Sequence, residues 1–102
     1  MNADSQDAHQ RDVQSALARL RHELAGLEAE IVGVEGRLRK IRARQHVIER
    51  RAMDAIRAGD DRAARAALVE MLPHAEDAAP LEADLTVLRA MADECRRWLG
   101  TA

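Results

Sequence analysis

Apolar residues recur along the first half of the chain at alternating spacings of four and three. The aliphatic members of this series are Val13, Leu17, Leu20, Leu24, Leu27, Ile31, Val34, Leu38 and Ile41. A polar Gln45 follows, and Ile48, Ala52 and Ala55 continue the spacing. With Leu17 at heptad position a and Leu20 at position d, every member falls at a or d, which is typical of a coiled coil. The pattern predicts one helix over about residues 11–58, preceded by a flexible polar tail over residues 1–10.

A turn is predicted where the first apolar series ends, at Gly59, Asp60 and Asp61. Glycine readily adopts the left-handed conformation that ends a helix, and aspartate is a favoured N-terminal cap for the next one. The sequence therefore predicts that the chain reverses direction at residues 59–61.

The second half of the chain predicts two shorter helices. A helix over about residues 62–72 is expected to bury Leu68, Met71 and Leu72. Proline disrupts a helix interior, so Pro73 is expected to kink or interrupt the helix, and residues 74–79 form either a kinked turn or a short loop before Pro80. A third helix over about residues 80–99 then restores the four-three spacing. Its seam consists of Leu81, Leu85, Leu88, Ala92, Cys95 and Leu99.

Charges support an antiparallel hairpin independently of the apolar pattern. Folding about residue 60 places five pairs of opposite sign across the seam: Glu23–Arg97, Glu30–Arg89, Arg37–Glu82, Arg44–Glu76 and Arg51–Glu70. A parallel, in-register dimer of the first helix would instead bring like charges together, and such repulsion selects against a pairing. The predicted fold is an all-α antiparallel coiled-coil helical hairpin, with two copies forming a four-helix bundle.

The composition predicts that the chain assembles with a partner. Phe and Tyr are absent and Trp98 is the only aromatic residue, so the core must be built from aliphatic seams. The net charge of -2 argues against nucleic acid, and the lone Cys95 fits a reducing compartment. The sequence shows no signal peptide and no transmembrane segment. We expect a cytoplasmic protein that forms a homodimer and binds a further, unidentified protein.

Catalytic and metal-binding patterns are not found. The four histidines are scattered, no His or Cys pair has metal-ligand spacing, and Cys95 lies at a core position of the seam. We expect no enzymatic activity and no cofactor. Candidate partner-binding residues are the charged turn (Asp60, Asp61, Arg62, Arg65), the basic band of the first helix (Arg39, Lys40, Arg42, Arg50) and Trp98. No aromatic residues lie between these cations, which disfavours nucleic acid as the partner.

The stretch Gly59-Asp60-Asp61-Arg62-Ala63-Ala64-Arg65-Ala66-Ala67-Leu68 is followed at Leu81 by Leu-Glu-Ala-Asp-Leu. This pattern resembles the phage-shock-protein-A family, whose relatives include the vesicle-inducing protein of plastids, over about residues 15–99. The resemblance implies a long helical hairpin with the acidic Gly-Asp-Asp segment at its tip. The amphipathic N-terminal helix by which that family binds membranes is not seen here, so peripheral membrane contact stays open.

The function predicted from these observations is that of a non-catalytic coiled-coil interaction or scaffold protein. One alternative is a membrane-stress or polymer-forming protein like those of the phage-shock family. A second alternative is a secretion-type escort or a phage-encoded inhibitor that acts by binding.

Overall fold

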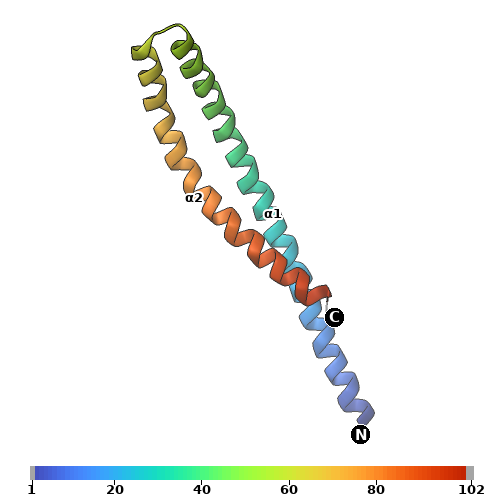
Figure 1. Cartoon of the computed structure of the whole chain (residues 1–102). Coiled ribbons are helices and arrows are strands. Elements are labelled where there is room, and N and C mark those ends of the chain that lie inside the picture. Colours follow the sequence, from blue (N-terminus) through green and yellow to red (C-terminus); the bar gives the residue numbers. More distant parts are fainter. Residues whose placement is uncertain (1, 101–102) are drawn as a thin grey trace. The chain divides into compact units, whose positions relative to one another are not determined.

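Two helices account for the part of the chain that the computed structural model describes, residues 2–100. Helix α1 spans Asn2–Arg57 and α2 spans Asp61–Gly100, and no strand occurs among these residues. The chain is the predicted all-α helical hairpin (Figure 1). It divides into two units, which we call the turn unit (residues 32–86) and the terminal unit (residues 2–31 with 87–100).

The turn between the helices is closed by two caps. Gly59 has a φ of 71°, the left-handed conformation predicted for it. The amide of Asp60 donates to the carbonyl of Ala55 at 2.9 Å, and the amide of Gly59 donates to the carbonyl of Ile56 at 3.1 Å. These two bonds form a Schellman motif, which satisfies carbonyls at the end of α1. The Asp60 carboxylate then accepts a hydrogen bond from the amide of Ala63 at 3.0 Å, capping α2.

The apolar seam of α1 lies where the heptad pattern predicts it. In the turn unit Val34, Leu38, Ile48 and Ala52 are buried, whereas their neighbours on α1 are half-buried or exposed. Leu38 is 2% exposed and is the most deeply buried of the large side chains among the described residues. Burial of these aliphatic side chains is the main favourable term that holds the helices together.

The first turns of α2 bury different residues from those predicted. Leu68 and Leu72 were expected in the seam, but 52% and 59% of their surfaces are exposed. The buried residues are instead the small Ala64, Ala67 and Ala78; Met71 is half-buried as expected, and packs on the core cluster containing Ala67. The prediction assumed that the larger residues are buried, whereas in the structure the heptad register decides which residues face α1. Seam positions recur at Ala64, Ala67, Met71, His74, Ala78, Leu81 and Leu85.

The predicted interruption near Pro73–Pro80 is also wrong. Helix α2 is continuous from Asp61 to Gly100 with both prolines inside it, so the two predicted shorter helices are one. Pro73 and Pro80 lie seven residues apart and are exposed, which places both on the outer face of α2. Each proline removes one backbone hydrogen bond on the solvent side, while Met71, Ala78 and Leu81 continue the seam on the inner side. Tertiary packing therefore overrides local propensity here.

In the terminal unit α1 begins earlier than predicted. Residues 2–10 were expected to be a flexible tail, but they are helical from Asn2; Met1 lies outside the described residues. The seam runs from Leu17 to Ile31 of α1, facing the buried Ala92 and Cys95 of α2. The N-terminal turns of α1 continue beyond the C-terminal end of α2 (Figure 1), and Val13 of the seam is exposed.

Candidate interaction surfaces

The charged turn brings its four predicted site residues together at the start of α2. Asp61, Arg62 and Arg65 are exposed in the first turns of this helix. Asp60 has a structural part, because its carboxylate caps α2. At the turn, a partner could therefore contact the side chains of Asp61, Arg62 and Arg65.

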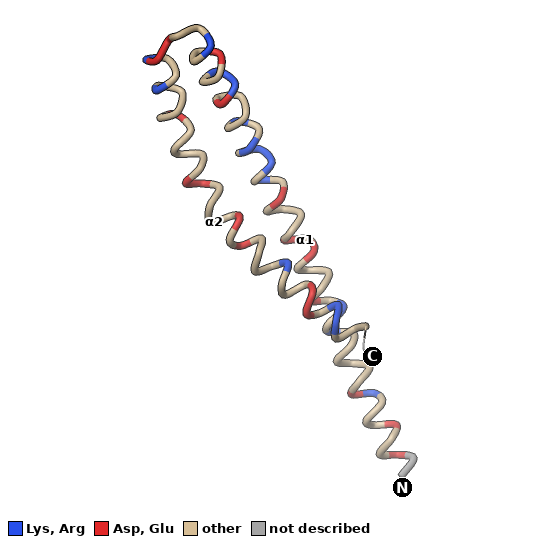
Figure 2. The backbone as a smooth tube through the Cα atoms, viewed as in Figure 1, with Lys and Arg blue, Asp and Glu red and all other residues tan. Residues whose placement is uncertain are grey.

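The basic band divides into paired and unpaired cations. Arg42 donates to a carboxylate oxygen of Glu82 on α2 at 3.2 Å, so it contributes to the hairpin's own pairing. Arg39, Lys40 and Arg50 are exposed and form no ion pair with another residue that the structure describes. Blue residues follow one another along this stretch of α1, whereas α2 carries several red ones in the same unit (Figure 2).

The predicted charge pairing across the hairpin is confirmed in one pair and altered in others. Arg51 and Glu70 form an ion pair at 2.9 Å, as expected. Glu82 was assigned to Arg37 but pairs with Arg42. Arg97 was assigned to Glu23 but pairs with Glu94 on its own helix. Charged side chains are long and have several oppositely charged groups nearby, on either helix, so the sign of the pairing is easier to predict than the partner.

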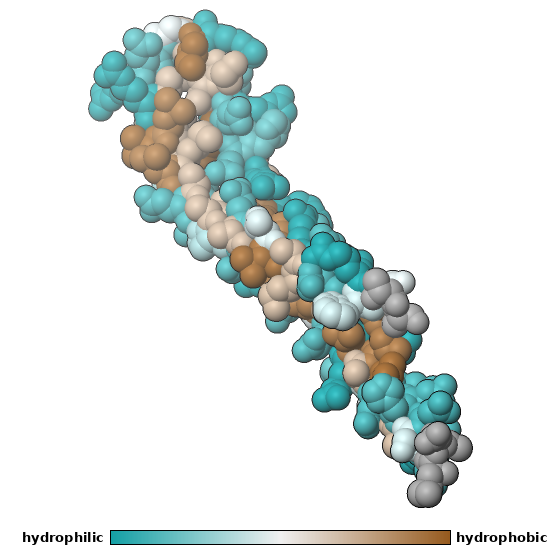
Figure 3. Space-filling view, turned by 60° about the horizontal axis from the view of Figure 1, so that its bottom comes forward, coloured by the Kyte–Doolittle hydropathy of each residue, from teal (hydrophilic) through white to brown (hydrophobic). Residues whose placement is uncertain are grey.

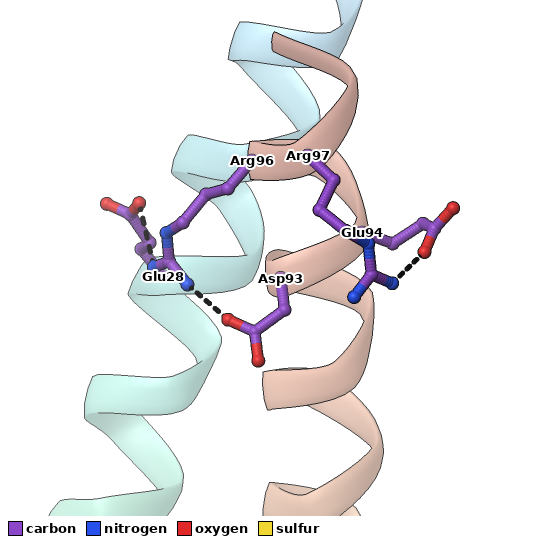
Figure 4. A network of polar contacts seen from close by, with 5 residues as sticks. All are labelled: Glu28, Asp93, Glu94, Arg96 and Arg97. Atoms are coloured by element: carbon purple, nitrogen blue, oxygen red, sulfur yellow. Dashed lines mark hydrogen bonds and ion pairs between the residues drawn. The ribbon is translucent and has the colours of Figure 1, made fainter. Parts of the chain in front are cut away.

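An ion-pair network ties the two helices of the terminal unit together. The Arg96 guanidinium lies between Glu28 of α1, at 3.3 Å, and Asp93 of α2, at 2.9 Å (Figure 4). Beside it Arg97 pairs with Glu94, and this hydrogen bond together with the charge of Arg97 lowers the pKa of Glu94. All these side chains are largely exposed, so the network fixes the pairing more than it stabilises the fold.

Trp98 lies in a groove of the terminal unit with a volume of about 520 Å³. The groove is lined by Leu20, Glu23, Gly26, Leu27, Glu30, Met91, Glu94, Cys95 and Trp98. The Trp98 indole N–H donates to Glu94 at 3.1 Å, yet 60% of the residue's surface remains exposed. The sequence singled out Trp98 but not the groove, because the groove requires the two helices to be placed side by side.

An apolar patch on α2 is not predicted by the sequence pattern, which places its leucines in the core. Leu68, Val69 and Leu72 are all more than half exposed. Figure 3 shows apolar side chains gathered on the surface in the part of the molecule near the turn. The register of Leu81 and Leu85 is the signal that could have revealed the patch. Counted back in steps of seven residues, it places Ala67 and Ala64 in the seam and therefore leaves Leu68 and Leu72 outside it.

The comparison with protein-family models decides the classification. The model of the PspA/IM30 family matches residues 7–102. The chain belongs to the PspA/IM30 family. No curated protein and no solved structure gives a significant match.

Membership of the PspA/IM30 family confirms the resemblance seen in the turn motif. The Gly-Asp-Asp segment of this PspA/IM30 chain does form the turn between two long helices. No helix among the described residues is long and apolar enough to cross a membrane. The same residues contain no group of three His, Cys, Asp or Glu side chains that could hold a metal ion.

Proposed function

We propose that this PspA/IM30 chain is a non-catalytic scaffold protein of the cytoplasm that acts by protein–protein binding, with a second copy of itself as its first partner. The observation that carries the proposal is the exposed apolar patch formed by Leu68, Val69 and Leu72. Apolar side chains gathered on a surface mark interaction sites more often than isolated ones do.

The limited core of a single hairpin supports self-association. Small residues supply much of the buried seam: Ala52, Ala64, Ala67, Ala78 and Ala92. Meanwhile Met53 and Ile56 are exposed on α1 in the same unit as the patch. Packing a second hairpin over such faces adds buried apolar area that two helices alone cannot supply. A homodimer that forms a four-helix bundle is the smallest assembly with this property.

We expect Leu68→Gln/Leu72→Gln to weaken self-association by about tenfold or more, because two exposed leucines no longer leave water on assembly. Both side chains already face solvent, so the helical content should stay unchanged. Sedimentation velocity over a concentration series measures the effect. Val32→Gln, an exposed aliphatic residue on α1 of the same unit, is the matched control and should associate like the wild type. A wild-type protein that sediments only as an 11.3 kDa species at high concentration would contradict the proposal.

A peripheral membrane function is the second candidate, and the family match is the observation that favours it. The exposed cations Arg39, Lys40 and Arg50 provide a surface that anionic lipid headgroups could contact. We expect this function to appear as flotation with phosphatidylserine-rich vesicles but not with vesicles of phosphatidylcholine alone. Lys40→Glu/Arg50→Glu should abolish the flotation. Equal binding to both kinds of vesicle, or none to either, would remove this candidate.

A further inference from the structure

The groove around Trp98 combines an apolar floor with unpaired negative charge. Leu20, Leu27 and Met91 supply apolar lining, while Glu23 and Glu30 stand seven residues apart on α1, about 10 Å along the helix. Neither carboxylate forms an ion pair with another described residue. We call this site the acidic groove. Its lining suits a ligand that presents an apolar centre and at least two cations.

A surface with the complementary chemistry lies on α1 of the turn unit. Lys40, Ala43, Val47 and Arg50 follow one another at spacings of three, four and three, so they form one stripe along the outer face of the helix. Val47 is 60% exposed at its centre, and the two cations lie about 15 Å apart along the helix. Neither cation pairs with another residue that the structure describes. We call these four residues the basic stripe.

We propose that the acidic groove of one copy receives the basic stripe of a second copy. Val47 and Ala43 would cover the apolar floor, and Lys40 and Arg50 would meet the carboxylates of Glu23 and Glu30. This inference rests on the proposed self-association and names one of its interfaces. The apolar contact supplies affinity, whereas the charges select the register and exclude wrong pairings.

The two surfaces are different, so the contact is heterologous and each copy keeps one groove and one stripe open. The proposed contact is therefore distinct from the symmetric packing of a four-helix bundle. It also pairs Lys40 and Arg50 with Glu23 and Glu30, four charged residues that form no ion pair with other described residues within one copy.

Charge reversal with rescue tests the interface. Glu23→Lys/Glu30→Lys and Lys40→Glu/Arg50→Glu should each weaken self-association at least about tenfold, since like charges then meet across the contact. An equimolar mixture of the two variants should associate like the wild type, because each altered groove now matches an altered stripe. Asp7→Lys/Asp12→Lys, which changes the net charge as much as the groove variant does, is the control and should assemble normally.

Trp98 reports directly on the groove because it is the only aromatic residue of the chain. The stripe variant keeps Trp98 in an intact acidic groove, and Trp98→Phe can be added to the groove variant to silence its emission. Mixing these two proteins should shift the Trp98 emission to shorter wavelength as the groove fills. The shift should diminish at high salt.

The outcomes separate this inference from the proposed function. A wild-type protein that remains monomeric overturns both. A wild-type protein that associates, while both charge variants associate equally well, overturns only the groove-and-stripe contact. Loss of association in the variants without rescue in the mixture, or rescue without a change in Trp98 emission, also overturns this contact. Association that depends on Leu68 and Leu72 but not on these charges would leave the apolar patch as the supported interface.

Discussion

Leu38→Asp is expected to unfold the hairpin at room temperature. Leu38 lies at an a position of the α1 seam and is 2% exposed, so an aspartate there would be enclosed among aliphatic side chains. Burying an unpaired carboxylate costs several kcal/mol, and loss of the leucine removes roughly 2–5 kcal/mol of packing. That sum is comparable to the whole stability of a small domain, about 5–15 kcal/mol. Far-UV circular dichroism should show loss of most of the helical signal.

The control for this prediction lies at the turn, where a charge is exposed and a substitution changes little. Asp60→Asn keeps a side-chain oxygen that can accept from the amide of Ala63, and asparagine caps helices about as well as aspartate. We expect its free energy of unfolding to differ from that of the wild type by less than about 0.5 kcal/mol. If Asp60→Asn lowered the melting temperature more than Leu38→Asp, the assignment of the seam would be wrong.

Sequence periodicity predicts α1 well because its seam is built from large aliphatic residues. Val34, Leu38 and Ile48 are large and aliphatic, and all three are buried where the heptad places them. The turn is equally predictable, because a positive φ favours glycine and a helix N-cap favours aspartate, and Gly59 and Asp60 occupy these positions. In both places the local sequence is enough to predict the structure.

The same reasoning fails in the first turns of α2 because two preferences conflict there. Leucine is buried more often than alanine, yet the register places Ala67 inside and Leu68 outside. Which of the two residues is buried depends on the register of α2 against its partner helix, which a local window of sequence does not contain. The leucines that this register leaves exposed form the apolar patch on which the proposed self-association rests.

The candidate site was predictable as a set of charges but not as a geometry. Lys40 and Arg50 were singled out because they lie outside the seam, and the structure leaves both exposed and without an ion pair to a described residue. Arg42 was grouped with them, yet it pairs with Glu82. The acidic groove could not be predicted, since Leu20 and Met91 are separated by most of the chain and meet only through the hairpin.

Removing the prolines is expected to stabilise the protein. Pro73 and Pro80 lie inside a continuous α2, where each removes a backbone hydrogen bond and crowds the preceding turn. Proline in a helix interior is about 3 kcal/mol less favourable than alanine, and its restriction of the unfolded chain returns about 1 kcal/mol. Pro73→Ala/Pro80→Ala should therefore gain roughly 2 kcal/mol per site, which corresponds to about 10 °C or more in melting temperature.

Ala66 offers a matched control for the prolines, because it lies seven residues before Pro73 on the same exposed face of α2. Ala66→Pro should lower the free energy of unfolding by roughly 3 kcal/mol, since the surrounding helix is not adapted to a proline there. Thermal and urea melts followed by circular dichroism measure both changes. A stability that falls when Pro73 and Pro80 are replaced would mean that the backbone conformation they impose on α2 favours its packing against α1. The seam would then depend on the prolines instead of tolerating them.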